Sequence, residues 1–394
     1  MKNRKKLFSN YLLYTIALIS FNAHCWDNSQ HIKYNFLNLE YPDNAPASFN
    51  GGSSQAYNSL SYRLNLTEQF NAFDIETHYE FISLNSDSSN LNFLNPDENR
   101  LFSLTDDLSD NPDQLTYHRL DRLFVTYTTD TIITRFGRQA VTWGNGFFYN
   151  VMDIFNPFSP TAIDTEYKTG DDMLYIQSLN ESGNDWQLIV LPRRDTTGDI
   201  KETESSLAMK FHTVKASTDI DLLFAQHYGS SVIAVGLSHA IAESMWRFDI
   251  SHTQTEDNKN ISSLSTNIDY SWTGFGKNMY GYIEYYYNGF GVDDASGIAT
   301  PALLSRLQRG ELFANNRNYL ALGLRTELHP LVNLSTTIIH NATLNNSLLN
   351  LLLSYDVKQN LTLNTQLALA DQSNQNSLYD NPDNTFSLLI SYYF

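Results

Sequence analysis

The chain has 394 residues, with 43 acidic and 25 basic side chains that give a formal net charge of −18. Such an acidic chain is a poor binder of nucleic acid, because the negative phosphate backbone binds basic protein surfaces. Aromatic residues make up 13% of the chain, yet its mean hydropathy is −0.35. No run of about 18 apolar residues follows the amino-terminal region, which excludes a spanning helix there. Many aromatic residues in a polar chain are typical of strands whose side chains face lipid and water in turn.

The amino-terminal region has the layout of a secretory signal peptide. Basic residues at positions 2, 4, 5 and 6 precede a short apolar stretch over residues 11–21. Cleavage after Cys25 would place Ala23 and Cys25 at the two small-residue positions. We therefore expect a signal peptide over residues 1–25 and an exported domain over residues 26–394. The alternative is a lipoprotein anchored through Cys25, the only cysteine; if Cys25 leaves with the signal, the mature protein forms no disulfide.

From Gln30 onward the sequence contains about eighteen segments of alternating apolar and polar residues, each roughly as long as a tilted membrane strand requires. Successive side chains of a strand point to opposite faces, so each segment predicts one lipid-facing and one water-facing surface. The prediction is an all-β protein, a transmembrane antiparallel up-and-down β-barrel of about 18 strands, or about 16 if some segments are wrongly divided. The segments are 30–41, 55–66, 70–83, 117–128, 131–140, 172–180, 185–192, 205–216, 218–227, 231–241, 245–254, 262–273, 278–288, 317–328, 331–342, 347–357, 360–370 and 384–394.

The connection 84–116 is rich in Asn, Asp and Ser, and it includes Asp106, Asp107, Asp110 and Asp113. We interpret it as a solvated surface loop. The alternative is a divalent-cation site that bridges lipopolysaccharide.

The densest group of motifs lies between two central segments and reads GRQAVTWGNG at 137–146, DIFNPFSP at 153–160 and DTEYKTGDD at 164–172. A long connection rich in aromatic residues and proline is typical of a functional loop rather than a disordered one. The run resembles the corresponding region of porin-like, largely uncharacterised outer-membrane proteins of proteobacteria. In porins of about sixteen to eighteen strands the third external loop folds into the barrel, so the resemblance implies that residues 141–171 form an infolded constriction loop.

Charged residues in and beside this loop are the candidates for selectivity. A wide barrel leaves an aqueous lumen, and charges at its narrowest point select among solutes. An acidic loop facing a basic wall would orient polar solutes, whereas the alternative is that the charges form ion pairs that lock the loop; the preference for cations or anions stays open. The candidates are Arg119, Arg122, Arg135, Arg138, Trp143, Asp153, Asp164, Glu166, Lys168, Asp171 and Asp172.

The aromatic side chains of the loop have two interpretations. They could offer a stacking surface to a sugar or an aromatic solute, or they could form the small core of the loop itself. The residues are Trp143, Phe147, Phe148, Tyr149, Phe155 and Phe158.

Motifs for enzyme catalysis are weak. The sequence has neither Gly-x-Ser-x-Gly nor His-Glu-x-x-His, and its ten histidines show no metal-ligand spacing. We therefore expect no enzyme activity, no cofactor and no metal site. A barrel-embedded hydrolase is the alternative, because catalytic groups on neighbouring strands leave no recognisable spacing.

The chain ends in a strongly alternating strand. Phe386, Leu388, Ile390, Tyr392 and Phe394 fall on one face, opposite smaller and more polar residues. This strand resembles the last strand of bacterial outer-membrane β-barrels, which ends in Phe and is read by the barrel-assembly machinery. If Phe394 lies at the periplasmic end, the long connections all fall outside and the short ones in the periplasm, as in outer-membrane barrels.

The sequence thus predicts a porin in the outer membrane of a Gram-negative cell, through which small polar solutes diffuse. One alternative is an export or uptake barrel for a larger polysaccharide or hydrophobic substrate with partner machinery, and another is a structural or adhesive role. The expected partners are outer-membrane lipid, lipopolysaccharide and the barrel-assembly machinery. The oligomeric state stays open, with a homotrimer as one option.

Overall fold

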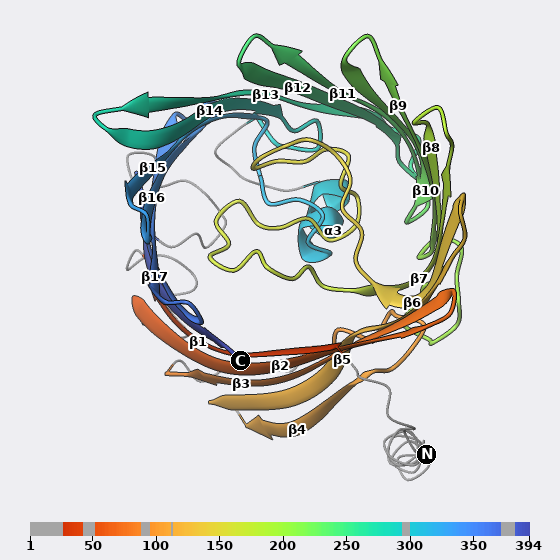
Figure 1. The fold of residues 1–394 in the computed structure, drawn as a ribbon, viewed down its shortest axis with the longest axis horizontal. Helices are drawn as coiled ribbons and strands as arrows, with labels where there is room; N and C mark the ends of the chain where they lie inside the picture. Colours follow the sequence, from red (N-terminus) through yellow and green to blue (C-terminus); the bar gives the residue numbers. More distant parts are fainter. Residues whose placement is uncertain (1–26, 42–51, 88–94, 112, 294–299, 372–382) are drawn as a thin grey trace.

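The computed structural model describes residues 27–41, 52–87, 95–111, 113–293, 300–371 and 383–394. They form one 19-stranded antiparallel sheet (Figure 1). The sheet closes because β1 (Asp27–Glu40) pairs with both β2 (Ser54–Phe70) and β19 (Asn384–Tyr393). Eighteen strands build the closed wall, which confirms the predicted fold class. The signal peptide expected over residues 1–25 lies outside the described residues.

Each of the predicted segments corresponds to one wall strand. The remaining wall strands are β3 (Phe73–Ser86), β5 (Gln114–Thr128), β6 (Ile132–Gln139), β7 (Asp171–Leu179), β8 (Asp185–Leu191), β9 (Ser206–Lys215), β10 (Thr218–His227), β11 (Ser230–Ile241), β12 (Ser244–Gln254), β13 (Asn260–Gly274), β14 (Lys277–Tyr287), β15 (Asn318–His329), β16 (Val332–Asn341), β17 (Asn346–Lys358) and β18 (Leu361–Ala370).

The wall follows the alternation of the sequence, with large apolar side chains outside. In β11, Val232 is 4% exposed and faces inward, whereas its neighbour Ile233 is 52% exposed on the outer surface. The large apolar side chains of the outer surface are exposed in the isolated barrel and can contact lipid. The buried residues of this fold are therefore those that face the lumen. Within the described ranges no helix is long and apolar enough to cross a bilayer.

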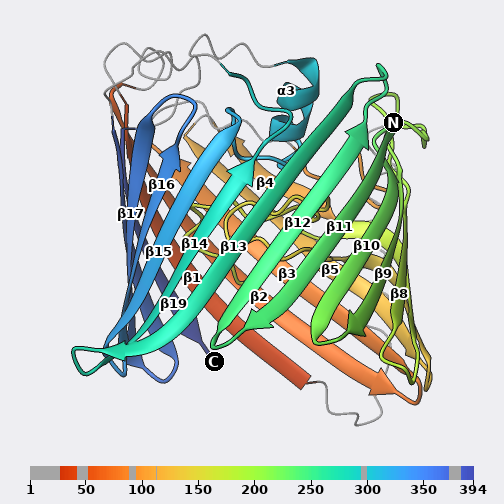
Figure 2. The same ribbon diagram turned by 90° about the horizontal axis from the view of Figure 1, so that it is seen from above.

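The two ends of the barrel carry different connections (Figure 2). At the end that holds the carboxyl terminus, tight turns such as 71–72, 216–217 and 242–243 join the strands. Asn71, Ala216 and Ala242 adopt positive φ there, as tight hairpin turns require. The opposite end carries the long connections, among them 140–170, 192–205 and 288–317, which is the segregation that the sequence predicts.

Two elements were not predicted. The connection 84–116, expected to be a plain solvated loop, contains β4 (Thr105–Asn111). This strand pairs with residues 114–119 of β5, beyond the point where β6 stops pairing with β5. The connection between β14 and β15 contains the helix α3 (Pro301–Gln308), whose first turn is capped by Thr300.

Candidate functional site

A long connection from β6 to β7, residues 140–170, lies inside the barrel (Figure 1), and we call it the lumen loop. The chain turns inward after Gln139, the last residue of β6 that pairs with β7, two residues beyond Gly137, whose φ is +126°. A Cβ at this position would lie 2.2 Å from the carbonyl oxygen of Leu123 on β5. Only glycine fits both the conformation and the close approach, so the departure of the loop from the wall is built into the sequence.

Two carboxylates on the far wall hold the outgoing half of the lumen loop. Glu284 of β14 accepts hydrogen bonds from the backbone N–H groups of Phe147, Phe148 and Tyr149, at 2.6, 3.1 and 2.9 Å. Asp249 of β12 accepts from the backbone N–H and the side-chain amide of Asn145, at 2.6 and 2.8 Å. Hydrogen bonds to a charged group contribute about 1.5–3 kcal/mol each, so these carboxylates fix the backbone of the loop against the wall.

Apolar contacts fix the same half of the loop. Trp143, Met152 and Phe155 are buried in one cluster with inward residues of β7 to β11 such as Ile189 and Leu223. The indole N–H of Trp143 donates to Gln187 at 2.7 Å. Trp143 and Phe155 therefore form the core of the loop, in agreement with the second interpretation of its aromatic residues.

The returning half of the loop is held by β1 and its neighbours. The ammonium of Lys33 on β1 lies 2.6 Å from Asp164 and 2.7 Å from Glu166. The Asp164 and Glu166 side chains remain 40% and 35% exposed, so both carboxylates stay accessible to water. The Arg63 guanidinium on β2 lies 4.1 Å from the ring centre of Tyr167, a cation–π contact.

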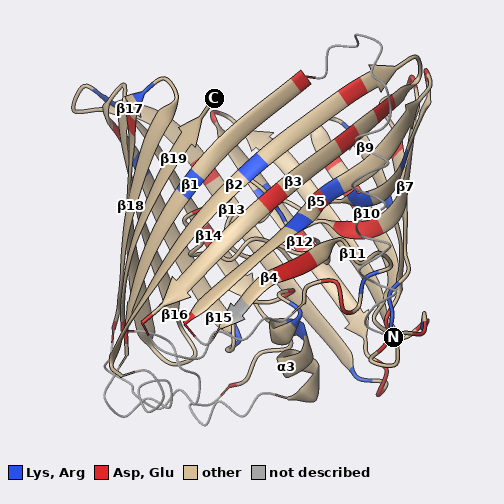
Figure 3. Cartoon of the chain, turned by 90° about the horizontal axis from the view of Figure 1, so that it is seen from below, with Lys and Arg blue, Asp and Glu red and all other residues tan. Residues whose placement is uncertain are grey.

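A charged band continues along the wall from β2 to β5, and we call Arg63, Glu80, Arg119, Asp121 and Arg122 the wall cluster. Arg63 and Arg119 both pair with Glu80 and Asp121, and Arg122 pairs with Asp121. Figure 3 shows basic segments on β1, β2 and β5 and an acidic segment on β3. The pairing of β5 with β3 shifts by one residue at Asp121. This irregularity turns Arg119, Asp121 and Arg122 all to the inside, which strict alternation would not allow.

A second group of the candidate residues is buried behind the loop that carries β4. Arg138 is fully buried and pairs with Asp97 and Asp172, each at 2.8 Å. Asp171 pairs with Arg193 at 2.6 Å. These charged side chains are buried in ion pairs with one another, so solutes in the lumen cannot contact them. Arg135 lies apart from them, between the rings of Phe124 and Tyr175.

The connection 288–317, which we call the helix loop, meets the lumen loop inside the barrel. Its Glu311 accepts from Arg306 at 2.6 Å, from Arg309 at 2.5 Å and contacts His227 of β10 at 3.2 Å. Burial alone would raise the pKa of Glu311, but His227 and the two arginines hold it well below its usual value. Glu311 therefore stays charged and ties the helix loop to the wall.

Ser206, His227 and Glu311 are aligned in the manner of a hydrolytic triad, with Ser206 Oγ 2.8 Å from His227 Nδ1. The hydroxyl oxygen, however, accepts a hydrogen bond from Arg193 at 2.9 Å, and Ser206 is buried. A nucleophile needs a free lone pair and a substrate beside it. The geometry therefore supports a structural network rather than catalysis. The described part of the chain contains no cluster of His, Cys, Asp and Glu suited to a metal ion.

Asp153 is the most unusual charge of the lumen loop. It pairs with Lys168, and Lys168 also donates to the backbone carbonyl of Val141 at 3.2 Å. Burial raises the pKa of Asp153 to about 6, although Lys168 and the backbone N–H of Phe155 favour its charged form. A carboxyl group in this position changes charge within the physiological range.

The sequence identified the charged residues of the lumen loop and of β5, but four wall residues that hold the loop or pair with β5 were missed. Lys33, Arg63, Asp249 and Glu284 all lie at inward positions of alternating strands. Their inward positions could have identified them from the sequence, because a charge on the lumen face of a barrel strand needs a polar partner. The choice of partner depends on contacts across more than a hundred residues of sequence.

No protein-family model matches the chain, and no curated protein matches it in sequence. Solved structures do share its fold. OccAB4 of Acinetobacter baumannii superposes with a TM-score of 0.59 at 10% identity, over 95% of this chain and 99% of that one. OccK5 (OpdH) of Pseudomonas aeruginosa has a TM-score of 0.57 at 12% identity, over 94% and 98%. OccK7 (OpdD) of Pseudomonas aeruginosa has a TM-score of 0.53 at 11% identity, over 95% and 99%. The chain therefore shares the closed β-barrel fold of these structures.

Proposed function

We propose that the protein is an outer-membrane channel through which small polar solutes diffuse past the lumen loop. The observation that carries the proposal is the path of this loop, which crosses from Gly137 to Glu284 on the far wall and returns to Lys33. A loop tied to opposite walls narrows a lumen to a fixed size. The porin fold of the similar structures supports the same function, and they are channels rather than enzymes.

The constriction would select by size and by charge, with no covalent chemistry. Asp164 and Glu166 place partly exposed carboxylates on one side, and the wall cluster carries three guanidinium groups against two carboxylates. An aqueous path between them has a transverse field that orients dipolar solutes. Arg138, Asp171 and Asp172 would act indirectly, by holding the two ends of the loop in place.

The location in the outer membrane accounts for the remaining sequence features. The signal peptide over residues 1–25 would direct export, and the assembly machinery would read the strand that ends in Phe394. The outward face of β19 would then contact lipid through Phe386, Ile390 and Tyr392, which are exposed in the barrel. Lipopolysaccharide would surround the end with long connections, and a homotrimer is one arrangement that this proposal allows.

Single-channel conductance of the refolded mature protein in a planar bilayer tests the proposal. We expect a steady open conductance, and the reversal potential in a salt gradient gives the ion preference. A folded barrel that conducts no ions would mean that the lumen loop and the helix loop close the path. The function would then have to be sought in gated transport or in a structural role.

A further inference from the structure

The pairing of β1 with β19 closes the barrel, and we call this pair of strands the seam. Every other pair of neighbouring wall strands is consecutive along the chain and is joined by a single connection. A short connection keeps two strands close even when their ladder opens, whereas β1 and β19 are the first and last described strands and have no such link. An open seam would expose two strand edges whose backbone N–H and C=O groups lipid cannot satisfy. The closed wall therefore depends on noncovalent contacts across the seam.

Residues 161–167, in the returning half of the lumen loop, lie across the seam, and we call them the seam segment. On one side of the seam, the side-chain amide of Gln366 on β18 donates to the backbone carbonyl of Thr161 at 3.0 Å. The hydroxyl of Tyr393 on β19 donates to Glu166, also at 3.0 Å. The segment is thus attached to the last two strands of the wall.

The same segment is attached to the first two strands, on the other side of the seam. The ammonium of Lys33 on β1 lies 2.7 Å from Glu166, and the side-chain amide of Asn65 on β2 donates to the hydroxyl of Tyr167 at 3.0 Å. Lys33 and Tyr393 contact the same carboxylate oxygen of Glu166, Oε2. One carboxylate therefore links β1 to β19.

Aromatic rings form a second link across the seam. His31 of β1 and Tyr393 of β19 lie directly opposite each other in the ladder, with 5.5 Å between their ring centres. The ring of Tyr167 stacks on His31 at 5.7 Å. The inward side chains of His31, Lys33 and Ser391 are buried, and hydrogen bonds are electrostatically stronger where water is excluded. The seam segment therefore protects the ladder that it crosses.

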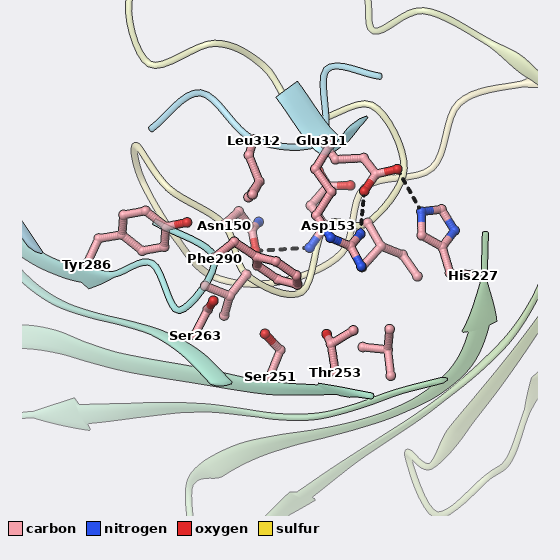
Figure 4. Close-up of a pocket in the computed structure, with 14 residues that line it drawn as sticks. Asn150, Asp153, His227, Ser251, Thr253, Ser263, Tyr286, Phe290, Glu311 and Leu312 are labelled. Carbon is pink, nitrogen blue, oxygen red and sulfur yellow. Dashed lines mark hydrogen bonds and ion pairs between the residues drawn. The ribbon is translucent and has the colours of Figure 1, made fainter. Parts of the chain in front are cut away.

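The other half of the lumen loop lies against strands that the chain itself joins. Asn150 and Asp153 line a small pocket together with Ser251 of β12 and Ser263 of β13 (Figure 4). Glu284 of β14 holds the backbone of this half through three hydrogen bonds. The strands β12, β13 and β14 are consecutive neighbours in the wall, so contacts in this half do not link β1 to β19.

We propose that the seam segment holds the barrel closed, in addition to narrowing its lumen. Glu166 can contact Lys33 and Tyr393 together only when β1 and β19 are paired. A segment that binds only the closed form stabilises that form by the free energy of its binding. The proposal concerns the stability of the wall, and it is independent of which solutes the channel conducts.

Unfolding rates of the full mature barrel in detergent test this proposal. Glu166→Ala combined with Tyr167→Ala removes contacts to both sides of the seam. Unfolding should then become about tenfold or more faster, as expected for the loss of hydrogen bonds to a charged group. Tyr393→Phe removes only the hydroxyl that donates to Glu166, and it should make unfolding about threefold or more faster. This smaller change decides the question if the double variant does not fold.

A disulfide across the seam shows whether the segment acts there. Tyr34→Cys with Ile390→Cys places two cysteines directly opposite each other on the lipid-facing side of the seam, at a Cα separation of about 4.5–5.5 Å that a disulfide can span. The mature barrel has no other cysteine, because the one cysteine of the chain is Cys25. Oxidation should abolish the effect of the double variant, since the seam can then no longer open. Ile338→Cys with Leu349→Cys, within the β16–β17 hairpin, is the matched control pair and should leave the effect in place.

Glu284→Gln serves as the control for the other half of the loop, and it should accelerate unfolding to the same extent with the seam disulfide as without it. Unchanged unfolding rates in the double variant and in Tyr393→Phe would overturn the proposal. An acceleration that persists with the seam disulfide would also overturn it, because the segment would then act on another part of the wall. If the seam disulfide abolished the effect of Glu284→Gln as well, the whole loop would stabilise the wall and the assignment to residues 161–167 would fail.

Discussion

At the scale of single residues, Asp153 links the electrostatics of the lumen to pH. Its pKa is raised to about 6 by burial, so the carboxyl is charged above that pH and neutral below it. Protonation leaves the buried Lys168 without its counter-charge. The local charge therefore becomes more positive by one unit as the pH falls.

The first prediction is a change of ion preference near pH 6. Lowering the pH from about 7.5 to 5 should raise the anion-to-cation permeability ratio by about twofold to fivefold, the size expected for one charge near an aqueous path. Asp153→Asn should show the low-pH preference at both values. Reversal potentials measured at several pH values check this, and an equal pH response in the variant would assign the effect to a titrating group other than Asp153.

The second prediction concerns Asp164 and Glu166. Replacing both with Asn and Gln removes two carboxylates that are partly exposed and leaves Lys33 unpaired, so the ion preference should shift toward anions. The reversal potential in a salt gradient gives the shift, which high salt should reduce by screening. An unchanged preference would place the two residues outside the conducting path.

At the scale of elements, the strands could be predicted because alternation is a local property of the sequence. β14, for example, is recognisable from the tyrosines of residues 280–287. The role of Glu284 within it could not be predicted, because three backbone N–H groups of a distant loop create that role. β4 could not be predicted for a similar reason. Residues 105–111 lack alternating apolar residues, and they form a strand only because β5 offers a free edge for pairing.

The third prediction tests how the lumen loop is held. Glu284→Gln leaves at most one acceptor for the three N–H groups and removes the charge, so it should destabilise the loop by about 1.5–3 kcal/mol or more and increase the noise of the open-channel current. Thermal unfolding and current recordings measure both effects. Glu181→Gln, in an exposed turn, is the control, and equal noise in the two variants would contradict the anchoring role.

The fourth prediction concerns the loop as an obstacle. Deletion of residues 145–165 should raise the conductance by about twofold or more, because conductance follows the narrowest section of the path. The variant must first show a normal content of β-structure by circular dichroism. Unchanged conductance in a folded variant would mean that the loop does not set the width of the path.

At the scale of the whole molecule, closure of the barrel depends on the two ends of the chain. β19 pairs with β1 along its length, and the backbone N–H of Phe394 donates to the carbonyl of Gln30 at 3.1 Å. The ring of Phe394 also packs edge-on to Tyr392 at 5.2 Å between centres. The last residue therefore belongs to the seam of the barrel as well as to its outer surface.

The fifth prediction is that deletion of Phe394 lowers the amount of folded barrel in the outer membrane, because the terminal strand loses an aromatic contact and one hydrogen bond at the seam. Quantitative blotting of heat-modifiable protein in outer-membrane fractions measures this. Phe394→Tyr keeps the ring and should assemble nearly as well. Normal levels of the deletion variant would contradict a role for the terminal residue in assembly.

The wall of this barrel is not equally tall around its circumference. β2 has 17 residues, whereas β6, β7 and β8 have 8, 9 and 7, and a tilted strand needs about 9–11 residues to cross the hydrocarbon layer. At the end with the long connections, β4 extends the wall beside β5. Its Asp106 and Asp107 side chains are exposed, and such carboxylates belong at the level of the lipid headgroups. The lipid beside β6 and β8 must therefore thin, or the barrel axis must lean toward that side, since either adjustment relieves a hydrophobic mismatch. The departure of the lumen loop from the wall thus determines how the protein sits in its bilayer.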